Sequence, residues 1–162
     1  MPTKIRSQRL LMRKLNYMEA CGEAKEWIEE EQFTTWKQIW DNCERGDWLM
    51  WLLIRISVPE PYGTYAVSAL EQGFGESLYS NCWGKFLIDV IKFGSGYHDA
   101  CVSHIISDKI SDYVWSNYSD SYILRNYHEN RLHKECCNRI RKVVPFVILR
   151  DALNGWCKEN YF

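Results

Sequence analysis

Residues 40–53, Trp-Asp-Asn-Cys-Glu-Arg-Gly-Asp-Trp-Leu-Met-Trp-Leu-Leu, decide the fold class of this chain. Five of the eight tryptophans fall within residues 27–51, at helical spacing rather than the alternation of a strand. Gly46 predicts a helix stop, because glycine adopts the left-handed conformation at low cost, and Asp47 predicts the cap of the next helix. The run Trp48–Ile56 is apolar nearly all round, so we expect this helix to be buried.

Apolar stripes at a spacing of three and four residues predict further helices on both sides of this segment. A loop is expected near 57–63, where Pro59, Pro61 and Gly63 oppose regular structure. The expected helices cover about 16–31, 34–43, 64–83, 86–93, 97–117, 121–143 and 146–154. Their expected caps are Asn16 with Glu19 in a capping box, Thr34 or Thr35, and Ser119 or Asp120, and Asn154-Gly155 is the expected final stop.

A strand interpretation exists for two short apolar runs, 54–58 and 143–148. No third strand or hairpin signal accompanies them. We therefore expect an all-α fold, a single-domain helical bundle of about six or seven helices. A length of 162 residues fits one domain. Residues 1–15 are expected to form a basic N-terminal arm, and residues 16–162 the helical domain.

Charge and composition argue against several classes of protein, including strong nonspecific nucleic-acid binders and membrane-spanning proteins. The net charge is −1, which argues against strong nonspecific binding of nucleic acid. The apolar run at 48–54 is too short to span a bilayer, and residues 1–15 lack the apolar segment of a secretory signal. The seven cysteines contain no Cys-x-x-Cys pair and are expected to be reduced core residues of a cytoplasmic protein. No membrane partner is expected.

Two motifs carry a resemblance to a known family. They are Cys21-x2-Ala24-x2-Trp27 and the segment from Trp40-x2-Cys43 through Glu-Arg-Gly-Asp-Trp-Leu-Met-Trp to Leu52. Together with the basic helix before Val144-Pro145-Phe146, they resemble a family of small phage and prophage proteins. Most members are uncharacterised, and some are provisionally labelled immunity proteins. The resemblance covers about half of the chain, because residues 64–130 are aromatic and polar where the family is alanine-rich. It implies a mobile-element origin and a place in the cytoplasm of a bacterial host cell.

Metal and nucleophile chemistry find little support in the residue pattern. Histidines and cysteines recur at helical spacing in two places, and such groups can ligate zinc. In the first, two helical turns separate His98 from His104, about 9 Å along the axis, which is too far for one ion. No motif selects a Cys–His nucleophile pair, and no glycine-rich phosphate loop is present. We expect no metal, no cofactor and no enzymatic activity; a small Cys/His enzyme stays as an alternative. The two groups of histidines and cysteines at helical spacing are His98, Cys101 and His104, and His133, Cys136 and Cys137.

Basic residues at the two ends of the chain suggest an alternative function as a nucleic-acid-binding regulator. The basic arm and the basic helix near 125–142 would form one patch if they meet in space, but the helix between 16 and 31 is strongly acidic. The residues that would bind nucleic acid are Arg6, Arg9, Arg13, Arg139, Arg141 and Lys142.

Tyrosine and tryptophan are more frequent in the middle of the chain than a core requires, and interfaces favour these residues. We therefore expect a non-enzymatic, phage- or mobile-element-encoded protein that binds and inhibits a bacterial defence or host complex by occluding a surface, in an anti-CRISPR-like or immunity-like manner. A homodimer is also compatible with an aromatic surface. The expected partner-binding residues are Tyr97, Tyr113, Tyr118, Tyr122 and Tyr127.

Overall fold

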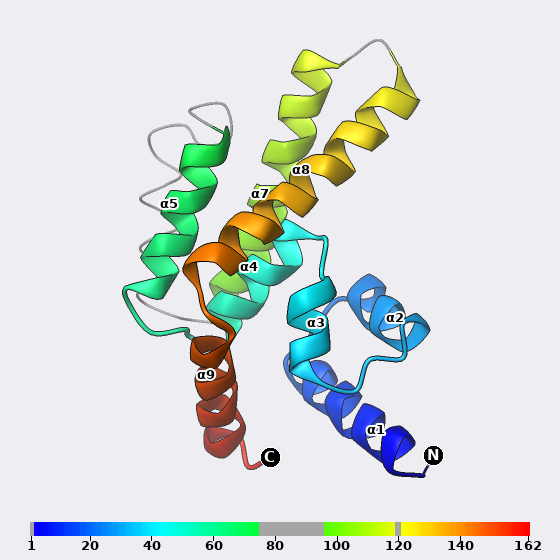
Figure 1. The fold of residues 1–162 in the computed structure, drawn as a ribbon, viewed down its shortest axis with the longest axis vertical. Helices are drawn as coiled ribbons and strands as arrows, with labels where there is room; N and C mark the ends of the chain where they lie inside the picture. Colours follow the sequence, from blue (N-terminus) through cyan, green and yellow to red (C-terminus); the bar gives the residue numbers. More distant parts are fainter. Residues whose placement is uncertain (1, 75–95, 119–120) are drawn as a thin grey trace. The chain divides into compact units, whose positions relative to one another are not determined.

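A computed structural model describes residues 2–74, 96–118 and 121–162 of the chain, and these residues form helices without any strand (Figure 1). The all-α prediction is confirmed. The described segments contain eight helices rather than six or seven. They are α1 (Pro2–Tyr17), α2 (Gly22–Glu30), α3 (Trp36–Asn42), α4 (Gly46–Arg55), α5 (Tyr62–Phe74), α7 (Gly96–Asn117), α8 (Tyr122–Val143) and α9 (Phe146–Glu159).

The chain divides into two compact units. The first unit contains Met1–Asn42 and Cys157–Phe162, and the second contains Cys43–Trp156. The first unit therefore holds α1, α2 and α3, and the second holds α4, α5, α7, α8 and most of α9. None of the described helices is both long enough and apolar enough to cross a membrane.

Residues 2–15 are helical, because α1 continues through them to Tyr17. Leu11 and Leu15 are buried on one side of α1. The prediction that a helix begins at Asn16 is wrong: the chain turns at Glu19, which has a φ of 62°, and α2 starts only at Gly22. The Glu19 and Ala20 N–H groups donate to earlier carbonyls of α1 and close its last turn.

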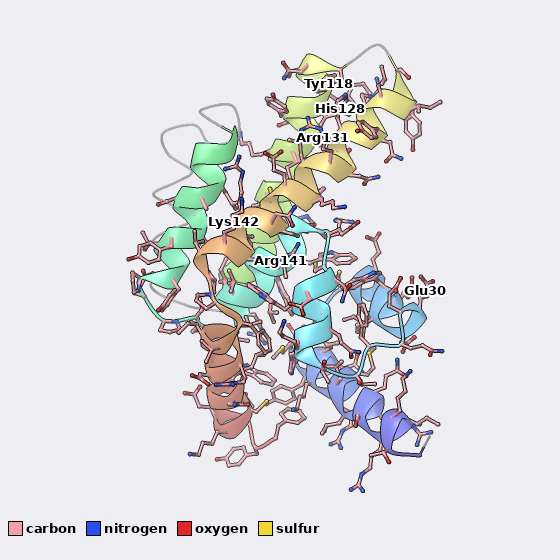
Figure 2. The ribbon with its side chains drawn as sticks, in the orientation of Figure 1. Glu30, Tyr118, His128, Arg131, Arg141 and Lys142 are labelled. Carbon is pink, nitrogen blue, oxygen red and sulfur yellow. The ribbon has the colours of Figure 1, made fainter. Side chains whose placement is uncertain are left out.

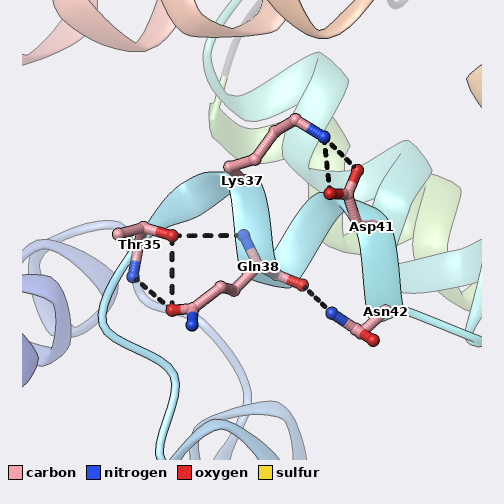
Figure 3. A network of polar contacts seen from close by, with 5 residues as sticks. All are labelled: Thr35, Lys37, Gln38, Asp41 and Asn42. Carbon is pink, nitrogen blue, oxygen red and sulfur yellow. Dashed lines mark hydrogen bonds and ion pairs between the residues drawn. The ribbon is translucent and has the colours of Figure 1, made fainter.

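The start of α3 confirms the predicted cap. Thr35 Oγ1 accepts a hydrogen bond from the Gln38 N–H at 3.2 Å, and Gln38 Oε1 accepts one from the Thr35 N–H at 3.1 Å (Figure 3). This reciprocal pair is a capping box, which satisfies two backbone donors that helix geometry leaves open. In the first turn of α3, Lys37 forms an exposed ion pair with Asp41 of the next turn, 2.6 Å from Nζ to Oδ1.

The predicted buried helix is confirmed as α4, which forms the core of the second unit. Its aliphatic side chains and Met50 are almost completely removed from solvent, whereas Trp48 and Trp51 are half-buried. Helix α4 packs against α5, α7 and α8. The predicted roles of Gly46 and Asp47 are wrong. Gly46 is the first residue of α4 rather than the stop of α3, and Arg45 holds the N-cap position before it. The buried side chains are Leu49, Met50, Leu52, Leu53 and Ile54.

The later helices follow the sequence periodicity closely, apart from their ends. Helix α8 begins behind Ser121, whose Oγ accepts the Leu124 N–H at 3.4 Å; the predicted caps Ser119 and Asp120 lie outside the described residues. The stop predicted at Asn154-Gly155 is wrong, because α9 continues to Glu159. Helix α5 is described to Phe74, and the remainder of the helix predicted at 64–83 and the one at 86–93 lie outside the described residues.

Candidate functional site

Helices α7 and α8 lie side by side and meet at one end of the second unit, where they extend past α4 (Figure 1). Large apolar side chains collect at this end. Among the twelve exposed large hydrophobic residues of the described chain, five fall between positions 115 and 127. We call these five and their three polar or aromatic neighbours the tip surface. It consists of Trp115, Tyr118, Tyr122, Ile123, Leu124, Arg125, Tyr127 and His128.

Contacts between side chains hold the tip surface in place. The guanidinium of Arg125 lies over the Trp115 ring, 3.7 Å from its centroid, and so joins α8 to α7. The Tyr118 ring stacks on the His128 ring, with centroids 3.6 Å apart and planes 13° from parallel (Figure 2). The Tyr127 ring meets the same imidazole edge-on at 5.1 Å. Cation–π and aromatic contacts of this kind contribute about 0.5–1.5 kcal/mol each.

An arginine of α8 orients the imidazole within this cluster. Arg131 Nε donates a hydrogen bond to His128 Nδ1 at 3.3 Å, and Arg131 Nη1 pairs with Glu135 Oε2 at 3.5 Å (Figure 2). Because Nδ1 accepts, the ring's own N–H is at Nε2. The tip surface thus has fixed rings rather than loose ones, and less conformational entropy is lost when a partner covers it.

The predicted tyrosines differ in their positions. Tyr122 and Tyr127 belong to the most exposed part of the tip surface, at 76% and 62% exposure. Tyr118 is half-buried under His128, and Tyr113 is half-buried one turn earlier in α7. Tyr97 lies in the first turn of α7, and its side chain is outside the described residues.

Sequence reasoning missed the aliphatic members of the tip surface. Ile123 and Leu124 continue an apolar stripe, so their positions predict core, yet they are exposed by 79% and 49%. Trp115 also continues a stripe but belongs to the aromatic residues in excess of a core, and it is 55% exposed. Their neighbour Val114 is the buried residue of that stretch of α7. A usable signal was present: Ile123 and Leu124 follow the cap at Ser121, and residues in the first turn of a long helix extend beyond the helices packed against its middle.

The His/Cys group on α8 that was considered as a zinc site belongs to a buried polar cluster. His133, Cys136 and Cys137 are almost completely buried, and His133 Nδ1 lies 3.5 Å from Asp47 Oδ1. Asp47 in turn accepts two hydrogen bonds from Arg45, at 3.0 and 2.8 Å. Within the described segments no group of three His, Cys, Asp or Glu residues is arranged to hold a metal ion. The structure describes only the backbone of His98 and Cys101, and His104 is exposed.

Burial lowers the reactivity of the two cysteine thiols on α8. Burial raises the pKa of the Cys136 thiol, and a hydrogen bond to Cys43 together with burial raises the pKa of Cys137. The same bond lowers the pKa of Cys43, whose thiol also donates to the Arg45 carbonyl at 3.4 Å. Cys136 and Cys137 therefore keep their protons, and a protonated thiol is a poor nucleophile and a poor metal ligand. Of the five described cysteines, only Cys21 is exposed.

The basic residues fall into two sets, one in each unit. Arg6, Arg9 and Arg13 are exposed on α1 in the first unit. On α8, Lys142 is exposed, whereas Arg139 and Arg141 are engaged in contacts within the protein. Arg139 Nη2 pairs with Glu135 at 3.2 Å, and Arg141 Nη1 donates to the Cys43 carbonyl at 2.8 Å.

Comparisons with models of protein families, with curated proteins and with solved structures gave no match to this chain.

Proposed function

We propose that this chain is a non-enzymatic binding protein, encoded by a phage or mobile element, that inhibits a bacterial defence or host complex by covering one of its surfaces. The observation that carries this proposal is the tip surface. Ile123 is 79% exposed and Tyr122 76% exposed at the meeting end of α7 and α8. Side chains of this size are usually buried, and an exposed group of them marks an interaction site.

The composition of the tip surface favours a protein partner. Tryptophan, tyrosine and arginine are the residues that most often contribute strongly to protein interfaces. Trp115, Tyr127 and Arg125 supply all three, and the Arg125 guanidinium lies against the Trp115 ring. Burial of apolar surface stabilises a complex by about 25 cal/mol per Å², so covering several of these side chains supplies a large part of a specific affinity.

The bacterial and phage context comes from the resemblance of the first third of the chain to small prophage proteins. Its motif residues Trp40, Cys43 and Leu52 are buried, and Gly46 is packed under α8. These residues stabilise the fold, so the family motif and the binding surface are separate parts of the chain. An inhibitor of this kind works by occlusion. We place its action in the cytoplasm of the bacterial host.

The test is phage plating on bacteria that each carry one defence system, with and without expression of this chain. We expect one system to lose its protection when the wild-type chain is present. The variant Tyr122→Ser/Ile123→Ser/Tyr127→Ser should restore that protection, because it removes the most exposed apolar side chains of the tip surface. Binding of the purified chain to the affected complex, measured by calorimetry, should be lost in the same variant.

The matched control removes exposed apolar side chains elsewhere in the second unit. Tyr65→Ser/Val147→Ser changes two residues that are 49% and 43% exposed on α5 and α9. This control should inhibit like the wild type. Equal inhibition by the tip variant, with its circular dichroism unchanged, would refute the tip surface as the binding site. Sedimentation that shows a dimer which the tip variant dissociates would assign the surface to a second copy of the chain.

A further inference from the structure

Helix α1 presents a row of three arginines to solvent. At 100° per residue, Arg6, Arg9 and Arg13 fall within about 60° of one another around the helix. All three are exposed, while Leu11 and Leu15 on the other side of α1 are buried. No acidic residue occurs before Glu19. All charged residues on the exposed side of α1 are therefore positive.

These arginines differ from every other arginine in the chain. Within the described residues, the side chains of Arg6, Arg9 and Arg13 have no hydrogen bond and no ion pair. The seven arginines outside α1 each have a partner. For example, Arg45 pairs with Asp47, and Arg125 lies over Trp115. The other partnered arginines are Arg55, Arg131, Arg139, Arg141 and Arg150. The fold thus uses its arginines in internal contacts everywhere except along α1.

We propose that α1 binds the phosphate backbone of double-stranded DNA, independently of base sequence, through Arg6, Arg9 and Arg13. Seven residues of helix separate the first and last of them, a span of about 10 Å. Duplex DNA presents one phosphate charge per about 1.7 Å of its axis, so a straight row of this length has several phosphates within reach. Guanidinium groups match phosphate oxygens in geometry and charge.

The arrangement favours a duplex over an anionic membrane or a single strand. A helix that lies in a membrane surface carries its apolar residues at the centre of the exposed face. In α1 the arginines lie at the centre of the exposed face, with Ile5 on one side of them and Leu10 and Tyr17 on the other. Binding of single strands depends on rings on which bases stack, and no ring lies between the arginines.

The acidic α2 lies in the same unit and limits the affinity. Glu26, Glu29 and Glu30 are exposed on α2 and repel phosphate, so binding by α1 is expected to be weak and strongly dependent on salt. Three phosphate contacts predict an affinity that falls about 40-fold between roughly 50 and 200 mM salt. This proposal concerns a surface in the first unit and does not depend on the tip surface in the second.

The experiment is fluorescence anisotropy of a short labelled duplex titrated with the full-length chain at several salt concentrations. The variant Arg6→Gln/Arg9→Gln/Arg13→Gln should lose about tenfold or more in affinity at low salt and flatten the salt dependence. Glutamine keeps a helix propensity close to that of arginine, so the melting curve should not change. The control Lys134→Gln/Lys142→Gln/Arg150→Gln removes the same charge from exposed positions of the second unit and should bind like the wild type.

Two results would overturn the proposal. The first is that the wild type does not bind the duplex at low salt. The second is an equal loss of affinity in both triple variants, which would show a dependence on net charge alone. Tighter binding to a single strand of the same length, or binding to phosphatidylserine vesicles in preference to the duplex, would assign α1 to another partner. The tip variant Tyr122→Ser/Ile123→Ser/Tyr127→Ser should bind the duplex normally, which separates this test from that of the proposed inhibition.

Discussion

His133 Nδ1 lies 3.5 Å from Asp47 Oδ1, and the two side chains are 3% and 5% exposed. The contact joins the middle of α8 to the first turn of α4. Arg45 completes the cluster, because its Nε and Nη2 donate to the two oxygens of the same carboxylate at 3.0 and 2.8 Å. His133 Nδ1 has no hydrogen-bond partner. The cluster therefore holds one ion pair and one imidazole whose charged form would be poorly solvated.

Removal of the central carboxylate should destabilise the fold strongly. Asp47→Ala leaves Arg45 without its bidentate partner and removes the carboxylate beside His133, at a cost of about 3 kcal/mol. Urea unfolding followed by circular dichroism measures the change. Asp151→Ala removes an exposed carboxylate on α9 and should change stability by less than about 0.5 kcal/mol. A loss at position 47 no larger than that of the control would contradict a structural role for the cluster.

Stability should fall as the pH is lowered through the range in which histidine is protonated. Burial lowers the pKa of His133 below its ordinary value of 6.5; Asp47 opposes the shift, and Arg45 adds to it. Below pH 6.5 the unfolded chain binds a proton that the folded chain does not, so the free energy of unfolding decreases. The slope is at most about 1.4 kcal/mol per pH unit, and the effect ends below the folded pKa. Urea unfolding at several pH values between about 7.5 and 5.5 measures it.

The pH dependence should disappear in His133→Gln, which has no group to protonate there. His104→Gln, on the exposed side of α7, is the matched control and should keep the slope of the wild type. A His133→Gln variant that loses stability on acidification as steeply as the wild type would place the responsible group elsewhere.

Two glycines should respond to alanine in opposite directions. At Gly46 an added Cβ collides with the Cβ of Cys136 and lies 3.4 Å from the His133 carbonyl, so Gly46→Ala should cost about 1–3 kcal/mol. At Gly155, inside α9, an added Cβ meets nothing within 4 Å. Gly155→Ala should stabilise the chain by about 0.5–1 kcal/mol, because alanine has the higher helix propensity. Thermal unfolding of both variants checks the signs, and stabilisation by both would mean that α8 does not pack closely on Gly46.

Helix interiors could be predicted from this sequence, but several helix ends could not. Apolar periodicity gave α4, α7 and α8, since each must bury one side. The ends were assigned from glycine, and Gly46 and Gly155 both lie inside helices. The left-handed conformation that closes a helix is adopted instead by four other residues: Glu19, Gln32, Ser57 and Tyr161, with φ between 53° and 62°. Each donates its N–H to an earlier carbonyl, so hydrogen bonding offsets the steric cost of the side chain.

Glycine should therefore stabilise the end of α4. Ser57 has a φ of 53°, and both its own N–H and that of Val58 close the last turn of the helix. Ser57→Gly removes the Cβ clash at no loss of these bonds and should raise the free energy of unfolding by about 0.5–1 kcal/mol. The reverse sign is expected for Ser116→Gly, an exposed position in α7 where glycine lowers helix propensity. Destabilisation by both substitutions would argue against the left-handed turn at Ser57.

The aromatic residues of the tip surface were predictable from composition, whereas its aliphatic members were not. Tyr122 and Tyr127 alternate with polar residues and so suggest a surface. Ile123 and Leu124 continue an apolar stripe, which indicates only that a face is apolar, not that another helix covers it. How far α7 and α8 extend past α4 depends on contacts distant in sequence, which single-chain periodicity does not contain.

The contact between Trp115 and Arg125 should be measurable as a coupling between α7 and α8. With the guanidinium 3.7 Å from the ring centroid, a double-mutant cycle of Trp115→Ala and Arg125→Ala should give an interaction energy of about 0.5–1 kcal/mol. Urea unfolding of the four proteins supplies the numbers. A cycle that pairs Trp115→Ala with Arg150→Ala, whose guanidinium contacts Asp151, should be additive. Additivity in both cycles would show that this contact does not join α7 to α8 at the tip surface.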